Sequence, residues 1–328
     1  MISSIDFVIT KYLDSIKPDR SEHTVRAYKN ALNVFRNLLI KELKVPQNTP
    51  IEKLTESDIL PFVIYLNELA PATEKLYLQA LKGFYEYVNA EGFAEINVLR
   101  LRNVIRQRAR HSPRRIPKLA VNDIERLLEF VANEQNLQAS GEENETLRAA
   151  RDRAFLLILA DTGLHVHEAC NLRCADINWE SSTIIISGNE KQAVIRSSNR
   201  SMRAIKDYLS LRAQLDGGSG KQLATLPLFA RHDKGAGKKI KPITPTTGRN
   251  IVAERVEQIL GKEAVGKITP HSFRHYFVTT ILRASGNLKL AQELARHSNI
   301  QITQRYAHLS DDELDKGYYE IFEGKETG

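Results

Sequence analysis

Apolar side chains recur every three or four positions through the first 105 residues, and nowhere do they alternate one by one. An α-helix turns once every 3.6 residues, so this spacing places them on one helix face, whereas a half-buried strand needs alternation. In one run Val25, Tyr28, Leu32, Phe35 and Leu39 follow one another at steps of three and four. We therefore predict a compact bundle of four or five helices for residues 1–105.

A run of arginines separates this helical part from the rest of the chain. Seven arginines and no acidic residue fall between positions 100 and 115, and Pro113 and Pro117 lie at the end of the run. The run is either a solvated linker or, as we favour, a basic strap along a phosphate backbone, with Arg106, Arg108 and Arg110 as contacts. The net charge of +7 also favours a polyanionic partner. The predicted divisions are a helical domain (1–105), a basic linker (106–116) and a second domain (117–328).

The second part of the chain combines helices with one short β-rich segment. Thr183 to Ile186 are all β-branched, and Val194 and Ile195 follow the turn at residues 188–190. Because β-branched side chains favour strands, we predict a small antiparallel hairpin that carries Lys191 at its tip. Helices are predicted on both sides of it, at residues 121–131, 146–159, 166–172 and 200–214. The predicted fold class is therefore mainly α, with a small antiparallel β-hairpin or sheet in the second domain.

Membrane, secreted and metal-dependent proteins are disfavoured. No stretch approaches 18 apolar residues and the N-terminus lacks a charged-then-apolar signal segment, so we expect a cytoplasmic, nucleoid-associated protein. Cys170 and Cys174 lie four apart in one predicted helix, which suits a reducing compartment. With His167 they would offer three zinc ligands, but a fourth ligand is not evident. We predict no metal and no cofactor.

Residues near the C-terminus form a phosphate-binding pattern. Thr269-Pro270 is typical of a helix start, which places His271 in the first turn and Arg274 on the same face. A second predicted helix ends near His297, and Tyr306 follows nine residues later. Histidine and arginine both hold phosphate, and a tyrosine hydroxyl can attack it.

The order His271-x-x-Arg274, His297, Tyr306 resembles the C-terminal signature of the tyrosine recombinase (phage integrase) family. The first half is similar to the core-binding domain of that family, through Ser21-x-x-Thr24-x-x-x-Tyr28. The resemblance implies a helical, SAM-like core-binding domain and a catalytic domain that close as a C-shaped clamp on double-stranded DNA. It also implies site-specific recombination at a specific DNA site through a 3′-phosphotyrosyl intermediate with a free 5′-hydroxyl.

Each candidate residue suits one part of this chemistry. Tyr306 would be the nucleophile, and Arg274 would clamp the phosphate with two donors. The other roles belong to His271 (proton acceptor or phosphate ligand), His297 (phosphate ligand), Lys191 (proton donor to the 5′ oxygen) and Glu168 (orienting the basic cluster). Simpler alternatives stay open: Tyr306 as a core residue, His271 as a cap residue, His297 as a helix-end histidine favoured by the dipole, and Lys191 as a solubilising hairpin tip.

Two positions depart from the family pattern. After Leu164 the family has arginine, where this chain has His165; before His297 the family commonly has glycine, where this chain has Arg296. A histidine lacks the planar fork of arginine, and losing such a clamp costs on the order of 3 kcal/mol of transition-state stabilisation. We interpret Arg296 as tolerated variation. For His165 we expect a phosphate-raised pKa and cleavage that improves from pH 8 towards pH 6, unless another cation such as Arg173 replaces it.

Three functions remain open at this point. The first is an active recombinase, the second a DNA-binding relative that cuts poorly and serves as an accessory protein, and the third a type IB topoisomerase. An apolar stripe after Tyr306 favours assembly, because in the family such a helix packs on a neighbouring subunit and supports a tetramer on DNA; its members are Leu314, Tyr318, Tyr319, Ile321 and Phe322. Further accessory proteins are left open. Other candidate DNA contacts, each also explicable as a solvated side chain, are Lys29, Lys82 and Lys239.

Overall fold

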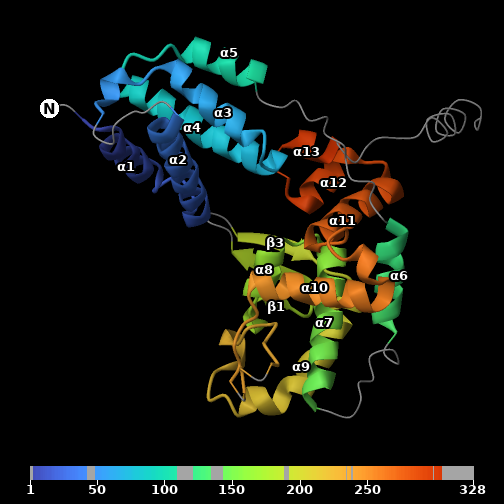
Figure 1. Ribbon diagram of the computed structural model, residues 1–328. Coiled ribbons are helices and arrows are strands. Elements are labelled where there is room, and N and C mark those ends of the chain that lie inside the picture. The colour runs from blue at the N-terminus through green and yellow to red at the C-terminus, as the bar shows by residue number, and fades with distance from the viewer. Residues whose placement is uncertain are drawn as a thin grey trace, which may run out of the picture. The chain divides into compact units, whose positions relative to one another are not determined.

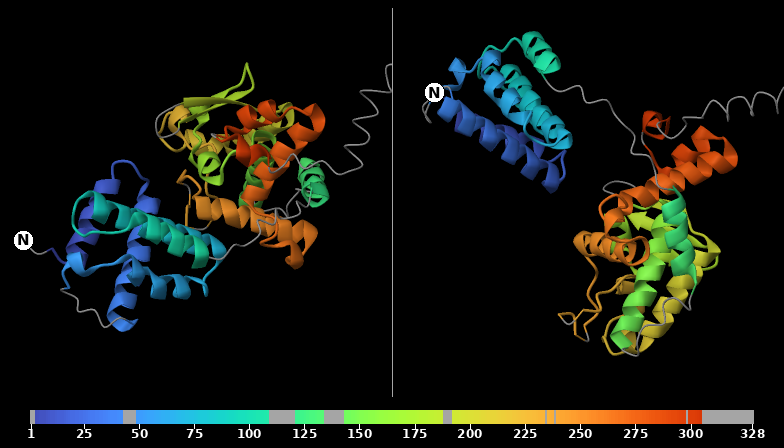
Figure 2. Two further views of the ribbon diagram at one scale, coloured as in Figure 1. Left: turned by 90° about the horizontal axis from the view of Figure 1, so that it is seen from above. Right: turned by 45° about the vertical axis from the view of Figure 1, so that its right-hand side comes forward.

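In a computed structural model the chain divides into two compact units, Met1–Arg115 and Ile116–Gly328 (Figures 1 and 2). The residues that the structure describes are 3–42, 49–108, 121–133, 143–187, 192–233, 235–237, 239–297 and 299–304.

The first unit is helical throughout its described residues. Its helices bury one continuous apolar core that includes Tyr28, Leu32, Phe35, Phe62 and Tyr85. The long helices α2 and α4 pack against each other, and α1, α3 and α5 pack around them. The α-helices are α1 (Ile5–Ile16), α2 (Glu22–Glu42), α3 (Leu60–Leu66), α4 (Pro71–Ala90) and α5 (Val98–Arg108). The predicted bundle is confirmed.

A short 3₁₀-helix precedes α3. It runs over Glu56–Ile59 after the cap residue Thr55, and α3 follows it directly. The Thr55 N–H donates to the Asp58 carboxylate at 2.7 Å, which satisfies a helix-start donor. Helix α5 continues to Arg108, so the arginines of the basic run from Arg100 to Arg108 lie on a helix.

The second unit combines helices with one small sheet. Its core includes Phe155, Ile184, Tyr208, Phe229 and Phe273. The sheet has the antiparallel order β1-β2-β3, with Ile184 opposite Ile177 and Ile195. The strands are β1 (Ile177–Asn178), β2 (Thr183–Ser187) and β3 (Gln192–Arg196). The predicted hairpin is therefore confirmed, with one short extra strand; its tip at 188–191 lies outside the described residues.

Helices α7 and α9 pack against each other, and α11 packs against both α7 and α12 (Figure 1). The helices of this unit are α6 (Val121–Ala132), α7 (Glu143–Thr162), α8 (Val166–Asn171), α9 (Asn199–Gly217), α10 (Pro245–Leu260), α11 (Pro270–Ser285), α12 (Leu288–Ala295) and α13 (Ile300–Gln304). None of the helices in the described part of the chain is long and apolar enough to cross a membrane.

Helix α10 has no counterpart among the sequence predictions. It begins as α11 does, with a threonine cap followed by proline: the Thr244 hydroxyl accepts the Thr247 N–H at 3.1 Å. A Cβ on Gly248 would approach Phe155, Val166 and Cys170 to 3.0 Å or less. Glycine at this position therefore lets α10 pack closely against α7 and α8.

Candidate active site

Arg274 forms the buried floor of the candidate site. It lies one turn into α11, after the Thr269 cap, and is 5% exposed. Its guanidinium donates to the Gly163 carbonyl at 2.5 Å and to the Ala295 carbonyl. Arg274 thus joins the turn after α7, which leads to His165 and Glu168, to the end of α12, where Arg296 and His297 lie.

Gly163 makes the first of these contacts possible. Its φ of +62° lies in the left-handed region, which glycine adopts without steric cost. A Cβ at this position would lie 2.5 Å from the Phe277 ring on α11. A glycine is therefore required where α7 ends and the chain turns towards His165.

Glu168 links three parts of the site. It accepts the backbone N–H of His165 at 2.8 Å, at the start of α8. Both Nη atoms of Arg296 donate to its two oxygens at 2.9 Å each. Burial alone would raise the pKa of Glu168, but the hydrogen bonds from Arg296 and His165 lower it. Glu168 is therefore an ionised carboxylate, and in the free protein its partner is Arg296.

Arg296 adopts an unusual backbone conformation for its residue type. It caps α12 with φ 56° and ψ 40°, the left-handed region. For an L-residue other than glycine, asparagine or aspartate this conformation costs about 1 kcal/mol. A glycine, as in the family pattern, would avoid that cost.

His297 is held by a side chain of α13 and by one of α12. Its Nδ1 lies 2.8 Å from the hydroxyl of the fully buried Thr303, and its carbonyl accepts the Gln292 amide at 3.0 Å. α13 ends at Gln304, two residues before Tyr306. Tyr306, Lys191 and the C-terminal apolar stripe lie outside the described residues, so their roles stay predictions.

The site histidines are held neutral in the free protein. Burial, followed by the positive charge of Arg274, lowers the pKa of His165 and of His297 to about 4. The same two causes lower the pKa of His271. Burial and then His271 lower the pKa of His275 to about 4; the rings of these two histidines lie edge to face with centroids 4.3 Å apart. The sequence pattern did not point to His275, although it lies one helical turn from His271.

His165 is therefore uncharged in the free protein, and the expected rise of its pKa beside a bound phosphate stays a prediction. A pKa of about 4 leaves the imidazole neutral from pH 8 to pH 6, the range over which we expected the histidinium form to help. The sequence prediction considered the phosphate but not the positive neighbours. Arg274 and Arg296 both act against protonation of His165.

We expect the free energy of unfolding to decrease as the pH falls from 6.5 to 5. The unfolded histidines, with pKa near 6.5, bind protons in this range, whereas His165, His275 and His297 in the folded state do not. After a large discount for solvent screening, the total is on the order of 2 kcal/mol. Urea unfolding at both pH values measures it. Replacing His275 and His297 by glutamine should reduce the difference, and an unchanged pH dependence would contradict this explanation.

The candidate DNA contacts differ in how accessible their side chains are. The side chains of Lys29 on α2, Arg106 on α5 and Lys239 are exposed. Lys82 instead lies 3.8 Å from Glu86. The side chain of Arg108 and the whole of Arg110 lie outside the described residues.

The basic run is partly neutralised by acidic residues from elsewhere in the first unit. The Arg100 guanidinium lies 3.1 Å from Glu56, and Arg102 donates to Glu86 at 2.6 Å and 3.2 Å. The sequence, which shows no acid within the run, could not show these partners.

Two other candidate sites are less suited to chemistry. Burial raises the pKa of Cys170 to about 12, which disfavours the thiolate that zinc binds. Within the described residues, no group of three His, Cys, Asp or Glu side chains could hold a metal.

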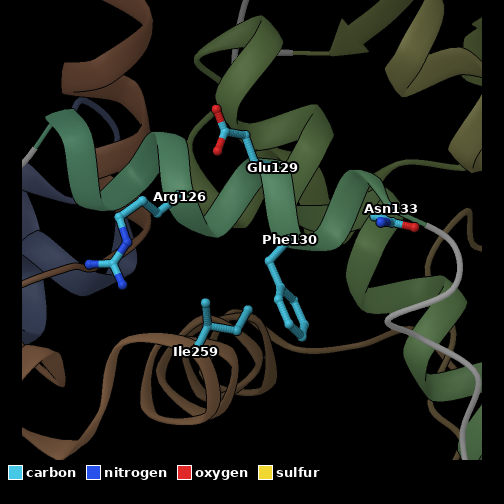
Figure 3. A pocket seen from close by; sticks show the side chains of 5 residues that line it. All are labelled: Arg126, Glu129, Phe130, Asn133 and Ile259. Carbon is cyan, nitrogen blue, oxygen red and sulfur yellow. The ribbon is translucent and has the colours of Figure 1, made fainter.

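An open hollow between α6 and α10 is lined by Arg126, Glu129, Phe130, Asn133 and Ile259, none of which belongs to the cluster around Arg274 (Figure 3).

The comparison with protein families gives two matches in chain order. The sequence model described as "Phage integrase, N-terminal SAM-like domain" matches residues 9–92. The model of the phage integrase family matches residues 118–313, more than half of the chain.

Among curated proteins, the chain is similar to tyrosine recombinases XerC. It is 28% identical to the one from Thermodesulfovibrio yellowstonii over 317 residues, covering 94% of this chain and 93% of the relative. It is 27% identical to the one from Bacillus subtilis over 316 residues, covering 95% and 93%.

Solved structures share the fold at low identity. The Tn1549 transposon integrase in complex with a circular intermediate DNA aligns with a TM-score of 0.67 at 18% identity, covering 95% of this chain and 99% of that one. XerH recombinase bound to a palindromic difH substrate aligns with a TM-score of 0.65 at 20% identity, covering 91% and 80%. With both family models matched in order, the chain belongs to the phage integrase, or tyrosine recombinase, family.

Proposed function

We propose that this protein is a site-specific DNA recombinase that cuts and rejoins double-stranded DNA through a 3′-phosphotyrosyl intermediate at Tyr306. The observation that supports it best is the cluster around the buried Arg274: its charge lowers the pKa of His271 and His297, and Glu168 binds the backbone of His165 close by. In this cluster two segments far apart in the sequence place basic side chains together, and the chain then leads through α13 to Tyr306. The relatives named tyrosine recombinases, and the fold shared with recombinases bound to DNA, support the same function.

The proposed reaction is a transesterification. The Tyr306 oxygen attacks the phosphorus, its proton passes to His271, and the bond from phosphorus to the 5′ oxygen breaks. Lys191 gives its proton to that oxygen, so a free 5′-hydroxyl leaves. Arg274 and His297 stabilise the charge on the non-bridging oxygens. The phosphotyrosyl bond retains the phosphodiester, so a 5′-hydroxyl can rejoin the strand without a cofactor.

A second function, a DNA-binding relative that cuts poorly, is favoured by one observation. His165 takes the place of the family arginine, and its low pKa leaves it without charge at neutral pH. A duplex nicked close to the cleavage point tests both proposals, because the short 5′-hydroxyl fragment diffuses away and the covalent adduct accumulates. The target site itself is obtained by selecting bound duplexes from a random library. An adduct on the selected duplex supports the recombinase, whereas tight binding without adduct supports the second function.

We expect DNA affinity to fall steeply with salt, with the basic run contributing to the slope. Replacing Arg106, Arg108 and Arg110 by alanine should flatten the plot of log K against log salt by roughly 2 to 3 units, at about 0.9 for each phosphate that is no longer neutralised. Binding measured by fluorescence anisotropy at several salt concentrations gives the slope.

The matched control for this prediction removes an ion pair without changing the net charge. Arg100→Gln combined with Glu56→Gln deletes the 3.1 Å pair that the same helix makes. The slope should stay at its original value, since a paired arginine neutralises no phosphate. Equal flattening in the control would mean that Arg100 neutralises phosphate despite its ion pair, and an unchanged slope in the variant of Arg106, Arg108 and Arg110 would mean that the run is only a solvated linker.

A further inference from the structure

Arg296 stands at a position where the backbone favours glycine, and its side chain has a specific partner. It follows Ala295, whose carbonyl Arg274 contacts, and precedes His297. Its guanidinium binds Glu168 across 128 positions of sequence. Glu168 in turn holds the backbone N–H of His165. The Arg296 guanidinium therefore lies beside the residue that replaces the family arginine.

The guanidinium keeps donors for a further ligand. Of the five N–H groups of an arginine side chain, two are used by Glu168. The buried Nε has no hydrogen-bond partner in the described part of the chain. The side chain is 23% exposed, so it is sheltered but reachable.

The charge of Arg296 acts on the same cluster as that of Arg274. Both arginines lower the pKa of His165 and of His297. Because the neutral His165 brings no charge at pH 7, the cation on this side of the cluster is Arg296. Arg173 is the other cation that could replace the family arginine. It follows the C-terminal end of α8, whereas His165 precedes the N-terminal end, and its backbone pairs with that of Pro227.

We infer that Arg296 supplies the second guanidinium of the phosphate site, in place of the arginine that His165 replaces. It donates to a non-bridging oxygen of the scissile phosphate, while Glu168 fixes its orientation. This inference rests on the proposed function and makes Arg296 a catalytic residue. The two departures from the family pattern are then linked: the guanidinium lost at His165 is supplied from Arg296. Arg296 would therefore have a specific role and would not be a tolerated variation.

A double-mutant cycle on the nicked duplex tests the inference. Arg296→Gly should lower the rate of adduct formation at least about a hundredfold, as removal of a charge-stabilising donor does. Adding His165→Arg should restore most of that rate, so the gain from His165→Arg should be much larger in the Arg296→Gly background than in the unmodified protein. Arg296→Lys, which keeps the charge but not the planar fork, should stay at least roughly tenfold slow.

The cycle also separates catalysis from a structural role. If Arg296 only fastened α12 to α8, an arginine at position 165 would not restore cleavage, and DNA affinity and the urea midpoint would fall with the rate. We expect the midpoint of Arg296→Gly to stay close to that of the unmodified protein, since the glycine relieves the left-handed backbone. Normal cleavage by Arg296→Gly, or no rescue by His165→Arg, would overturn the inference.

A second measurement does not depend on cleavage. Inorganic phosphate should raise the thermal midpoint of the unmodified protein above that in chloride of equal ionic strength, and Arg296→Gly should lose most of this shift. If the unmodified protein forms no adduct but the phosphate shift depends on Arg296, the proposed function fails and the phosphate site stands. If neither the shift nor the adduct depends on Arg296, the inference is wrong whatever the protein does to DNA.

Discussion

Replacing Tyr306 by phenylalanine will abolish the covalent protein–DNA adduct and leave DNA affinity unchanged. The substitution removes one hydroxyl, which is the proposed nucleophile, and no charge that contacts the DNA backbone. Without a nucleophile the attack on phosphorus cannot occur, so the expected loss is complete. Denaturing gel electrophoresis of the trapped adduct measures it, together with anisotropy for affinity.

Tyr276→Phe is the matched control for this experiment. Tyr276 lies on α11 in the same unit, and its side chain forms a hydrogen bond with Arg200. This control should form the adduct at a normal rate. An adduct that survives Tyr306→Phe would exclude Tyr306 as the nucleophile, and weaker DNA binding would indicate a structural tyrosine.

Arg274→Lys is expected to be the most damaging substitution among the described site residues. A lysine cannot reach both the Gly163 and the Ala295 carbonyl, and it lacks the planar fork that holds a phosphate. We expect adduct formation to fall at least about a hundredfold. The free energy of unfolding should fall by roughly 1 to 3 kcal/mol, because a buried carbonyl loses its donor.

Arg283→Lys offers the comparison, since it makes the same chemical change in the last turn of the same helix at an exposed position. It should leave both cleavage and urea unfolding unchanged. Normal cleavage by Arg274→Lys would remove the phosphate clamp from the proposed mechanism. Lost cleavage with an unchanged urea midpoint would show that the carbonyl contacts do not stabilise the fold.

Local patterns in the sequence anticipate most of the fold. The steps of three and four in the first unit predict its helices, and the β-branched run at Thr183 predicts β2. α10 carries the same signals, because its buried residues Gly248, Ile251, Val252 and Val256 follow steps of three and four after a Thr244-Pro245 start, so its absence from the predictions has no physical cause in the sequence. β1 is only two residues long, so it shows no periodicity.

The site could be predicted only in part. Spacing along the chain anticipates that His271 and Arg274 share a helix face, which the structure confirms. It does not reveal that Arg274 contacts a carbonyl 111 positions away, or that Arg296 binds Glu168. The low pKa of His165 in the free protein comes from burial and then from Arg274, neither of which the sequence shows.

The ion pairs on α5 have a consequence for how a recombinase would search a chromosome. Glu56 and Glu86 hold Arg100 and Arg102, so the helix offers random DNA less positive charge than its sequence suggests. Non-specific affinity arises almost wholly from such charges, and a genome offers a vast excess of wrong sites. Weaker attachment at each wrong site shortens the time lost there. The carboxylates of Glu56 and Glu86 would thus shorten the search for the target, and they would also weaken the binding of this helix to DNA phosphates.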